Sequence, residues 1–106
     1  MGVEALYTTI ETKDVNILGV PVKIKTISGY EYLRITDRAR KGTDIDRAVY
    51  AKELINACVV SPQLNIGKLS TTAILLLVSK IEEALGVAEA VQKNLSEAQI
   101  PELKST

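Results

Sequence analysis

The sequence predicts a mainly helical α+β domain, in which an N-terminal β-hairpin or extended segment precedes a bundle of three to four helices. Three observations predict this fold class. Residues 20–27 alternate apolar and polar from Val22 onward, which is the period of a half-buried strand. Two segments between residues 30 and 60 repeat apolar residues at helical spacing. The clearest helical period of the chain is formed by Ile74, Leu77, Val78, Ile81 and Leu85.

Residues 1–27 are expected to be extended. Residues 8–12 are mostly β-favouring types, and Asn16 and Gly19 lie where a turn between two strands would fall. Pro21 suits an edge strand or the start of a strand. A two-stranded hairpin is marginal by itself, so it must pack against the helices that follow.

Two helices are predicted between residues 30 and 60. The first runs from about Tyr30 to Lys41 and ends at Gly42, since glycine often follows a helix. The second is predicted to be capped by Thr43, with Asp46 as the reciprocal residue of a capping box. It runs to about Val60 and turns one apolar face inward, made of Ala48, Ala51, Leu54, Ile55, Cys58 and Val59.

A third helix is predicted after a loop at 61–69, whose Leu64 and Ile66 point inward. Ser70 caps this helix, and Gly86 either ends or weakens it. Residues 87–95 can continue as a fourth amphipathic segment. The expected organisation is one domain over 1–95, extended over 1–27 and helical over 28–95, with a flexible tail at 96–106.

The composition excludes most kinds of catalytic site. The 106 residues contain no histidine and one cysteine, so imidazole bases, histidine metal ligands and thiolate cages are all missing. Cys58 lies on the apolar face of the second predicted helix and is interpreted as a small buried hydrophobe. No glycine-rich phosphate loop is present. We therefore expect no enzymatic activity, no catalytic residues, no cofactor and no metal.

The charges are balanced overall but separated along the chain. Thirteen basic and thirteen acidic side chains cancel, which argues against nucleic acid as the main partner. Residues 21–41 carry six basic and two acidic side chains, a local +4, whereas residues 82–106 carry five glutamates and two lysines, a local −3. One interpretation is ordinary solvated surface. The other is head-to-tail attraction between copies, which builds a ring or spiral.

The third predicted helix has more apolar residues than one face needs. Leu76 falls opposite its apolar stripe and Leu75 lies on the shoulder. Either the helix is central in the fold, or these leucines form a surface for a partner or another copy.

The order of these elements resembles the tail assembly chaperones of long-tailed (siphovirus-type) bacteriophages, which are encoded just upstream of the tape measure protein. The resemblance covers roughly residues 20–90. It is carried by Lys25-Thr-Ile-Ser-Gly-Tyr-Glu-Tyr-Leu33, by Leu54-Ile-Asn-Ala-Cys-Val-Val-Ser-Pro62, and by a last helix that opens at Leu69-Ser-Thr-Thr and closes on Ile81-Glu-Glu-Ala-Leu-Gly86.

The resemblance implies a protein that multimerises, binds the tape measure protein and recruits the tail tube protein. It also implies the host cytoplasm as location and absence from the mature virion. On this basis Leu75 and Leu76 are assigned to contact with the client or another subunit. Four basic residues are assigned to contact with acidic surfaces of partners, and we call them the basic group: Arg34, Arg38, Arg40 and Lys41.

Two alternatives remain open at this stage. The helices between residues 30 and 60 could form a small DNA-binding helix-turn-helix regulator, although the second helix offers only Arg47 and Lys52 as basic residues. The chain could also be another small phage structural protein, such as a head–tail connector or tail completion protein. No membrane segment is expected, because the longest apolar run, 73–78, is far too short to cross a bilayer.

Overall fold

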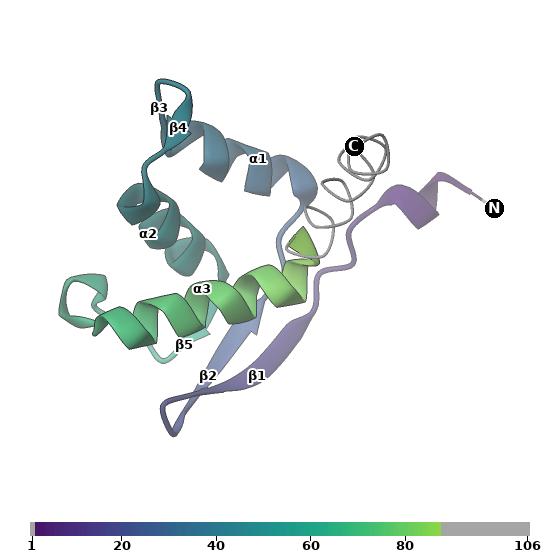
Figure 1. The fold of residues 1–106 in the computed structure, drawn as a ribbon. Helices are drawn as coiled ribbons and strands as arrows, with labels where there is room; N and C mark the ends of the chain where they lie inside the picture. The colour runs from purple at the N-terminus through teal and green to yellow at the C-terminus, as the bar shows by residue number, and fades with distance from the viewer. Residues whose placement is uncertain (1, 88–106) are drawn as a thin grey trace, which may run out of the picture.

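The computed structural model describes residues 2–87 (Figure 1). Its helices are η1 (Val3–Leu6), α1 (Gly29–Arg38), α2 (Arg47–Cys58), η2 (Ile66–Lys68) and α3 (Thr71–Leu85). Its strands are β1 (Thr12–Ile17), β2 (Val20–Lys25), β3 (Arg40–Lys41), β4 (Asp44–Ile45) and β5 (Val59–Ser61). The predicted fourth helical segment at 87–95 and the predicted tail at 96–106 lie almost wholly outside the described residues.

The predicted N-terminal hairpin is confirmed as β1 and β2. The strands pair antiparallel, with Val15 opposite Val22. Leu18 and Gly19 both have positive φ, 53° and 85°, which is the backbone of a tight two-residue hairpin turn. The side-chain oxygen of Asn16 accepts a 2.7 Å hydrogen bond from the Gly19 N–H and closes the turn.

The sequence predicts an extended segment before the hairpin, but this segment is not wholly extended. Val3–Leu6 forms a single 3₁₀ turn, and residues 7–11 are then irregular. Every residue from 2 to 14 is exposed to solvent. We call residues 2–11 the N-terminal arm.

Helix α1 begins where Ser28 caps it, since the Ser28 hydroxyl accepts a hydrogen bond from the Glu31 N–H at 3.1 Å. It ends at Arg38, earlier than the predicted Lys41. Arg40–Lys41 instead pairs with Asp44–Ile45 as a small hairpin whose turn contains Gly42, at φ 64°. A two-residue pairing has no period, so the sequence pattern does not reveal it.

Helix α2 is capped by Asp46 and not by Thr43, so the predicted capping box is wrong. The Asp46 carboxylate accepts hydrogen bonds from the N–H groups of Ala48 and Val49, at 3.0 and 3.2 Å. Thr43 cannot serve as the cap because it lies in the turn between β3 and β4. The helix ends at Cys58, before the predicted Val60, because Val59–Ser61 leaves it as β5 and pairs antiparallel with β2.

Helix α3 begins and ends as the sequence predicts. The Ser70 hydroxyl accepts a 3.1 Å hydrogen bond from the Ala73 N–H. Gly86 follows the helix with φ 74°, a left-handed conformation in which glycine carries no steric penalty.

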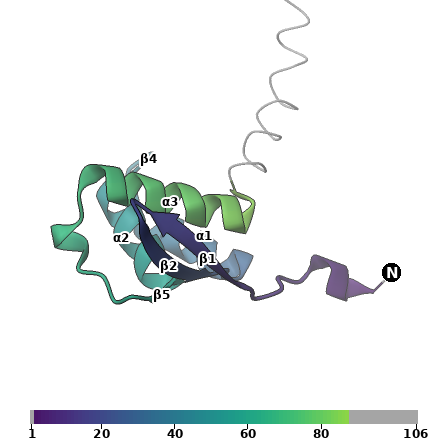
Figure 2. The same ribbon diagram turned by 90° about the horizontal axis from the view of Figure 1, so that it is seen from below.

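The core lies where α2 and α3 meet the sheet β1–β2–β5. Its largest fully buried side chains are Ile24, Ile35, Leu54, Ile55, Leu77, Ile81 and Cys58. Figure 2 shows β1 and β2 lying across the helical layer, and α3 contacts both strands as well as α2. Within residues 2–87 the fold is therefore three helices with a small three-stranded antiparallel sheet. The mixed α+β class is confirmed, whereas a three- to four-helix bundle is not clearly formed.

Candidate binding surface

An apolar groove of about 720 Å³ runs between α2 and α3. Its apolar lining is Ala48, Ala51, Ile66, Ile74, Leu75 and Val78. The groove stays open because two of the α2 residues that line it, Ala48 and Ala51, have small side chains; Arg47 and Tyr50 of α2 line it as well. Leu54 and Ile55 of α2, together with Cys58, are buried in the core and do not line the groove. We call this surface the α2–α3 groove.

A chain of three polar side chains beside this groove connects α1, α2 and α3. The Tyr50 hydroxyl of α2 donates to Oε2 of Glu82 in α3 at 2.6 Å, and it lies 2.9 Å from the Tyr32 hydroxyl of α1. The two tyrosine rings pack edge to face, with centroids 6.2 Å apart. Burial, followed by the hydrogen bond to Glu82, raises the pKa of Tyr50 far above its ordinary value. Tyr50 thus stays a neutral donor and holds α2 against α3.

The two leucines assigned to partner contact lie in different surroundings. Leu75 is 52 % exposed and lines the groove, so the structure leaves it available to a partner. Leu76 is half-buried and packs against the core. Its position opposite the Ile81 stripe is partly covered because α3 contacts both the sheet and α2, and this favours the central-helix interpretation for Leu76.

The basic group lies apart from the groove. Its four side chains are all exposed and belong to α1 and β3, which Figure 1 shows above α2 and away from the start of α3. Arg38 forms an ion pair with Glu53 of α2, and Arg40 lies 4.0 Å from Asp37. The Arg34 guanidinium stands 6.0 Å from the centre of the Tyr30 ring. Part of the local positive charge is therefore matched within the fold.

Cys58 is fully buried, as the sequence predicts. Burial raises the pKa of its thiol to about 11, so the reactive thiolate is rare near neutral pH. Cys58 serves the core in this structure.

Several other kinds of site receive no support from the described residues. Across residues 2–87, no three His, Cys, Asp or Glu side chains come together as a metal site. Helices α1 and α2 are separated by residues 39–46 with their hairpin, which is longer than the three- to four-residue turn of a helix-turn-helix. In the same part of the chain, none of the helices has the length and apolar character needed to span a bilayer.

A smaller cavity of about 260 Å³ lies where the N-terminal arm meets α1 and the end of α3. Its lining includes Thr9, Thr26, Ser28 and Tyr32. The Thr26 hydroxyl already donates to the Thr9 carbonyl and accepts from the Glu11 N–H. These bonds hold the root of the arm against the hairpin. Because the Thr26 hydroxyl is already used as donor and acceptor, it is not free to bind a ligand in this cavity.

The groove-lining role of Ala48 and Ala51 was missed by sequence reasoning, which placed both on the buried face of α2. The signal that could have found them is their small size on a face with large residues further along, because small side chains leave space between neighbouring helices.

No protein-family model, no curated protein sequence and no solved structure matches this chain.

Proposed function

We propose that the protein is a non-catalytic tail assembly chaperone of the long-tailed phage type, which multimerises and holds amphipathic helical segments of the tape measure protein. The observation that carries this proposal is the α2–α3 groove with the exposed Leu75 on its wall. An amphipathic helix binds by laying its apolar side chains into such a groove. A long helical client offers the same kind of segment repeatedly, so many copies can bind along it.

The basic group supports a second contact in this proposal. Arg34 and Lys41 are exposed and lie on the side of the fold formed by α1 and β3, away from the groove. An acidic surface of the tail tube protein, or of another subunit, could be attracted there while the groove holds the client. In this role the protein acts in the host cytoplasm and is absent from the finished virion.

The direct test uses the full chain and a tape measure fragment encoded by the neighbouring gene. Light scattering of the chain alone and of the mixture should show a multimer and a larger complex. Leu75→Asp should weaken fragment binding at least about tenfold, because a carboxylate would be buried in the apolar groove. The matched control is Leu18→Asp, since Leu18 is also exposed but lies in the β1–β2 turn.

Other outcomes would favour other functions. A chain that stays monomeric and ignores the fragment contradicts the proposal. Salt-dependent binding to duplex DNA would support the regulator instead. Detection of the chain in purified virions would support a head–tail connector or tail completion protein.

A further inference from the structure

The N-terminal arm exposes an unusual amount of apolar surface. Its four large apolar side chains are more than half exposed: Val3 at 59 %, Leu6 at 86 %, Tyr7 at 68 % and Ile10 at 60 %. Within residues 2–87, only the root of the arm is held by hydrogen bonds to the rest of the fold, those of Thr26 to Thr9 and Glu11. A solvated arm of this composition would gain free energy by burying these side chains against another surface.

The spacing of these four residues is i, i+3, i+4 and i+7, the pattern of a helix that docks in a groove. The first turn, Val3–Leu6, is already helical. Thr8 and Thr9 are β-branched and weaken a free helix, which agrees with the turn ending at Leu6. Contact with a groove would supply the missing stabilisation and extend the turn to Ile10.

The α2–α3 groove has the matching shape. It continues along α2 into a second hollow of about 770 Å³, and the two share Ala48 and Ile66 in their linings. Ala48 and Ala51 allow the backbone of an incoming helix to approach closely, and Leu75 stands exposed on the wall. The surface is therefore longer than one turn of helix. Its first hollow is mainly apolar, and its second also carries the polar side chains of Lys52, Asn56, Gln63 and Asn65.

The charges beside the two surfaces are complementary. The arm carries Glu4 and Glu11, which are seven residues apart and so fall on the same flank of the apolar stripe in a helix. The groove carries Arg47 in the first hollow and Lys52 in the second, both exposed on α2. Its one lining carboxylate, Glu82, already accepts the hydrogen bond from Tyr50.

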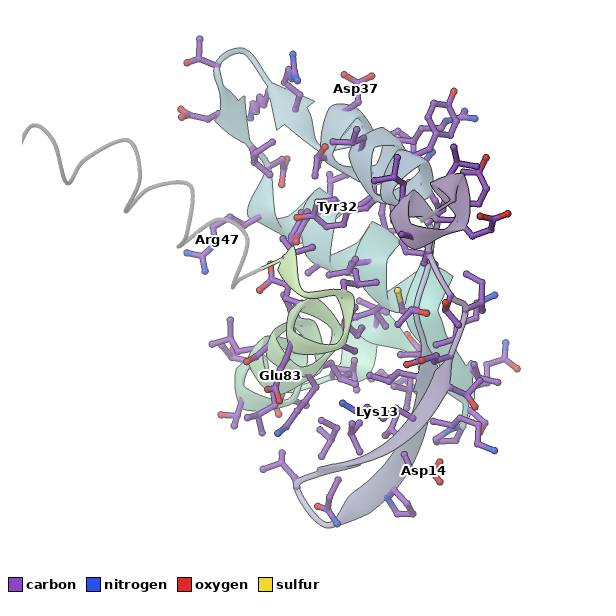
Figure 3. The ribbon with its side chains drawn as sticks, turned by 90° about the vertical axis from the view of Figure 1, so that its right-hand side faces the viewer. Lys13, Asp14, Tyr32, Asp37, Arg47 and Glu83 are labelled. Atoms are coloured by element: carbon purple, nitrogen blue, oxygen red, sulfur yellow. The ribbon has the colours of Figure 1, made fainter. Side chains whose placement is uncertain are left out.

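The arm and the groove of one chain lie on opposite sides of the fold. In Figure 1 the arm projects to the right, away from α2 and the start of α3, whose residues line the groove. Figure 3 shows Arg47 pointing out on the left, on the other side of the fold from the N-terminal turn. An arm that leaves its own fold in this direction meets a neighbouring molecule before it meets its own groove.

We propose that the N-terminal arm of one copy docks as a short amphipathic helix in the α2–α3 groove of a second copy. Val3, Leu6, Tyr7 and Ile10 face the apolar lining, and Glu4 and Glu11 face Arg47 and Lys52. The contact joins two different surfaces that lie on opposite sides of the fold, so successive copies propagate into a ring or an open spiral.

This inference rests on the helix-binding role of the groove in the proposed function, but not on the identity of the client. Its consequence is regulatory. Arm and client compete for the same groove, so a copy whose groove holds an arm is closed to client until the arm is displaced. Removing the arm's apolar contacts should therefore weaken self-association and strengthen client binding at the same time.

The first experiment measures the mass of the full chain by sedimentation over a range of concentrations. Wild-type chain should associate, and Leu6→Asp should shift the dissociation constant upward at least about tenfold, whereas Leu18→Asp should not. Both leucines are exposed, at 86 % and 61 %, so neither change disturbs the core. A wild-type chain that is monomeric throughout, or a Leu6→Asp chain that associates like wild type, would overturn the inference.

Charge reversal tests whether the glutamates of the arm pair with the basic residues beside the groove. The double variant Glu4→Lys/Glu11→Lys and the double variant Arg47→Glu/Lys52→Glu should each weaken association. All four changes in one chain should restore association to within about threefold of wild type, since every interface then regains opposite charges. Failure of the fourfold variant to recover would also overturn the inference.

A last measurement separates this inference from the proposed function. Tape measure fragment is titrated into wild-type and Leu6→Asp chains, and tighter binding by Leu6→Asp supports competition. A wild-type chain that is monomeric and still binds the fragment would contradict the arm contact but not the chaperone function. A chain that associates through its arm but does not bind the fragment would support the arm contact and contradict the chaperone function.

Discussion

The Tyr50 hydroxyl donates a 2.6 Å hydrogen bond to the Glu82 carboxylate, and this bond joins α2 to α3 at the end of the apolar groove. The Tyr32 hydroxyl of α1 meets Tyr50 at 2.9 Å, so one polar chain sets the spacing of three helices. The groove is open next to these side chains because Ala48 and Ala51 are too small to fill it. The width of the candidate binding surface therefore depends on a polar contact as well as on the core.

Removing the Tyr50 hydroxyl should loosen this arrangement. Tyr50→Phe leaves the half-buried Glu82 without its donor, and we expect a loss of about 1–2 kcal/mol in the free energy of unfolding. Urea denaturation followed by circular dichroism measures this free energy of unfolding. Tyr30→Phe is the control, because Tyr30 is 73 % exposed and should change stability by less than about 0.5 kcal/mol. Equal effects of the two changes would contradict the role given to the Tyr50–Glu82 bond.

The correct cap of α2 can be identified by mutation. Asp46→Ala removes the acceptor for the N–H groups of Ala48 and Val49 and should cost about 1 kcal/mol. Asp46→Asn should keep most of that stability. Thr43→Ala is the matched control, since the structure places Thr43 in the β3–β4 turn and predicts a change within about 0.5 kcal/mol. A larger loss for Thr43→Ala than for Asp46→Ala would reverse the assignment.

Two nearby leucines of α3 should respond very differently to truncation. Leu77 is 1 % exposed in the core, so Leu77→Ala should cost about 2–5 kcal/mol through lost burial and the cavity left behind. Leu75 is 52 % exposed in the groove, and Leu75→Ala should cost less than about 1 kcal/mol in the isolated chain. Urea midpoints of the two variants compare these losses directly. A similar destabilisation by both would mean that Leu75 is covered in the folded chain.

Alkaline pH should destabilise the fold through its buried thiol. Burial raises the pKa of Cys58 from about 9 to about 11, so the folded state holds the thiol proton more tightly than the unfolded state does. The stabilisation is complete below pH 9 and is lost as the pH rises toward 11. Thermal melts between pH 7 and 11 should show Tm falling above pH 9, less steeply for Cys58→Ala. Parallel curves for the two chains would contradict this cause.

The same burial predicts slow thiol labelling. At pH 8, a disulfide reagent such as dithionitrobenzoate should label native Cys58 at least about a hundredfold more slowly than chain unfolded in urea, because reaction requires both exposure and the thiolate. Rapid labelling of the native chain would show that the helix end near Cys58 opens readily.

Much of the fold follows from local signals in the sequence. Ser70 caps α3, and Gly86 ends it. Asn16 and Gly19 close the hairpin. These features depend on residues within a few positions of each other. The stripe of α3 likewise places Leu77 and Ile81 in the core. For the candidate site, the sequence identified Leu75 as surplus apolar surface but could not separate it from Leu76.

The sequence by itself thus determined the cap of α3, the hairpin turn, the helical periods and the absence of histidine chemistry. Only the tertiary structure decided that Val59–Ser61 joins β2, that Arg40–Lys41 pairs with Asp44–Ile45, and that Leu76 is half-buried while Leu75 is exposed. The physical reason is that a cap or a turn is satisfied by its own neighbours in the chain. A short strand, a groove or an exposed face is defined by whichever distant segment packs beside it.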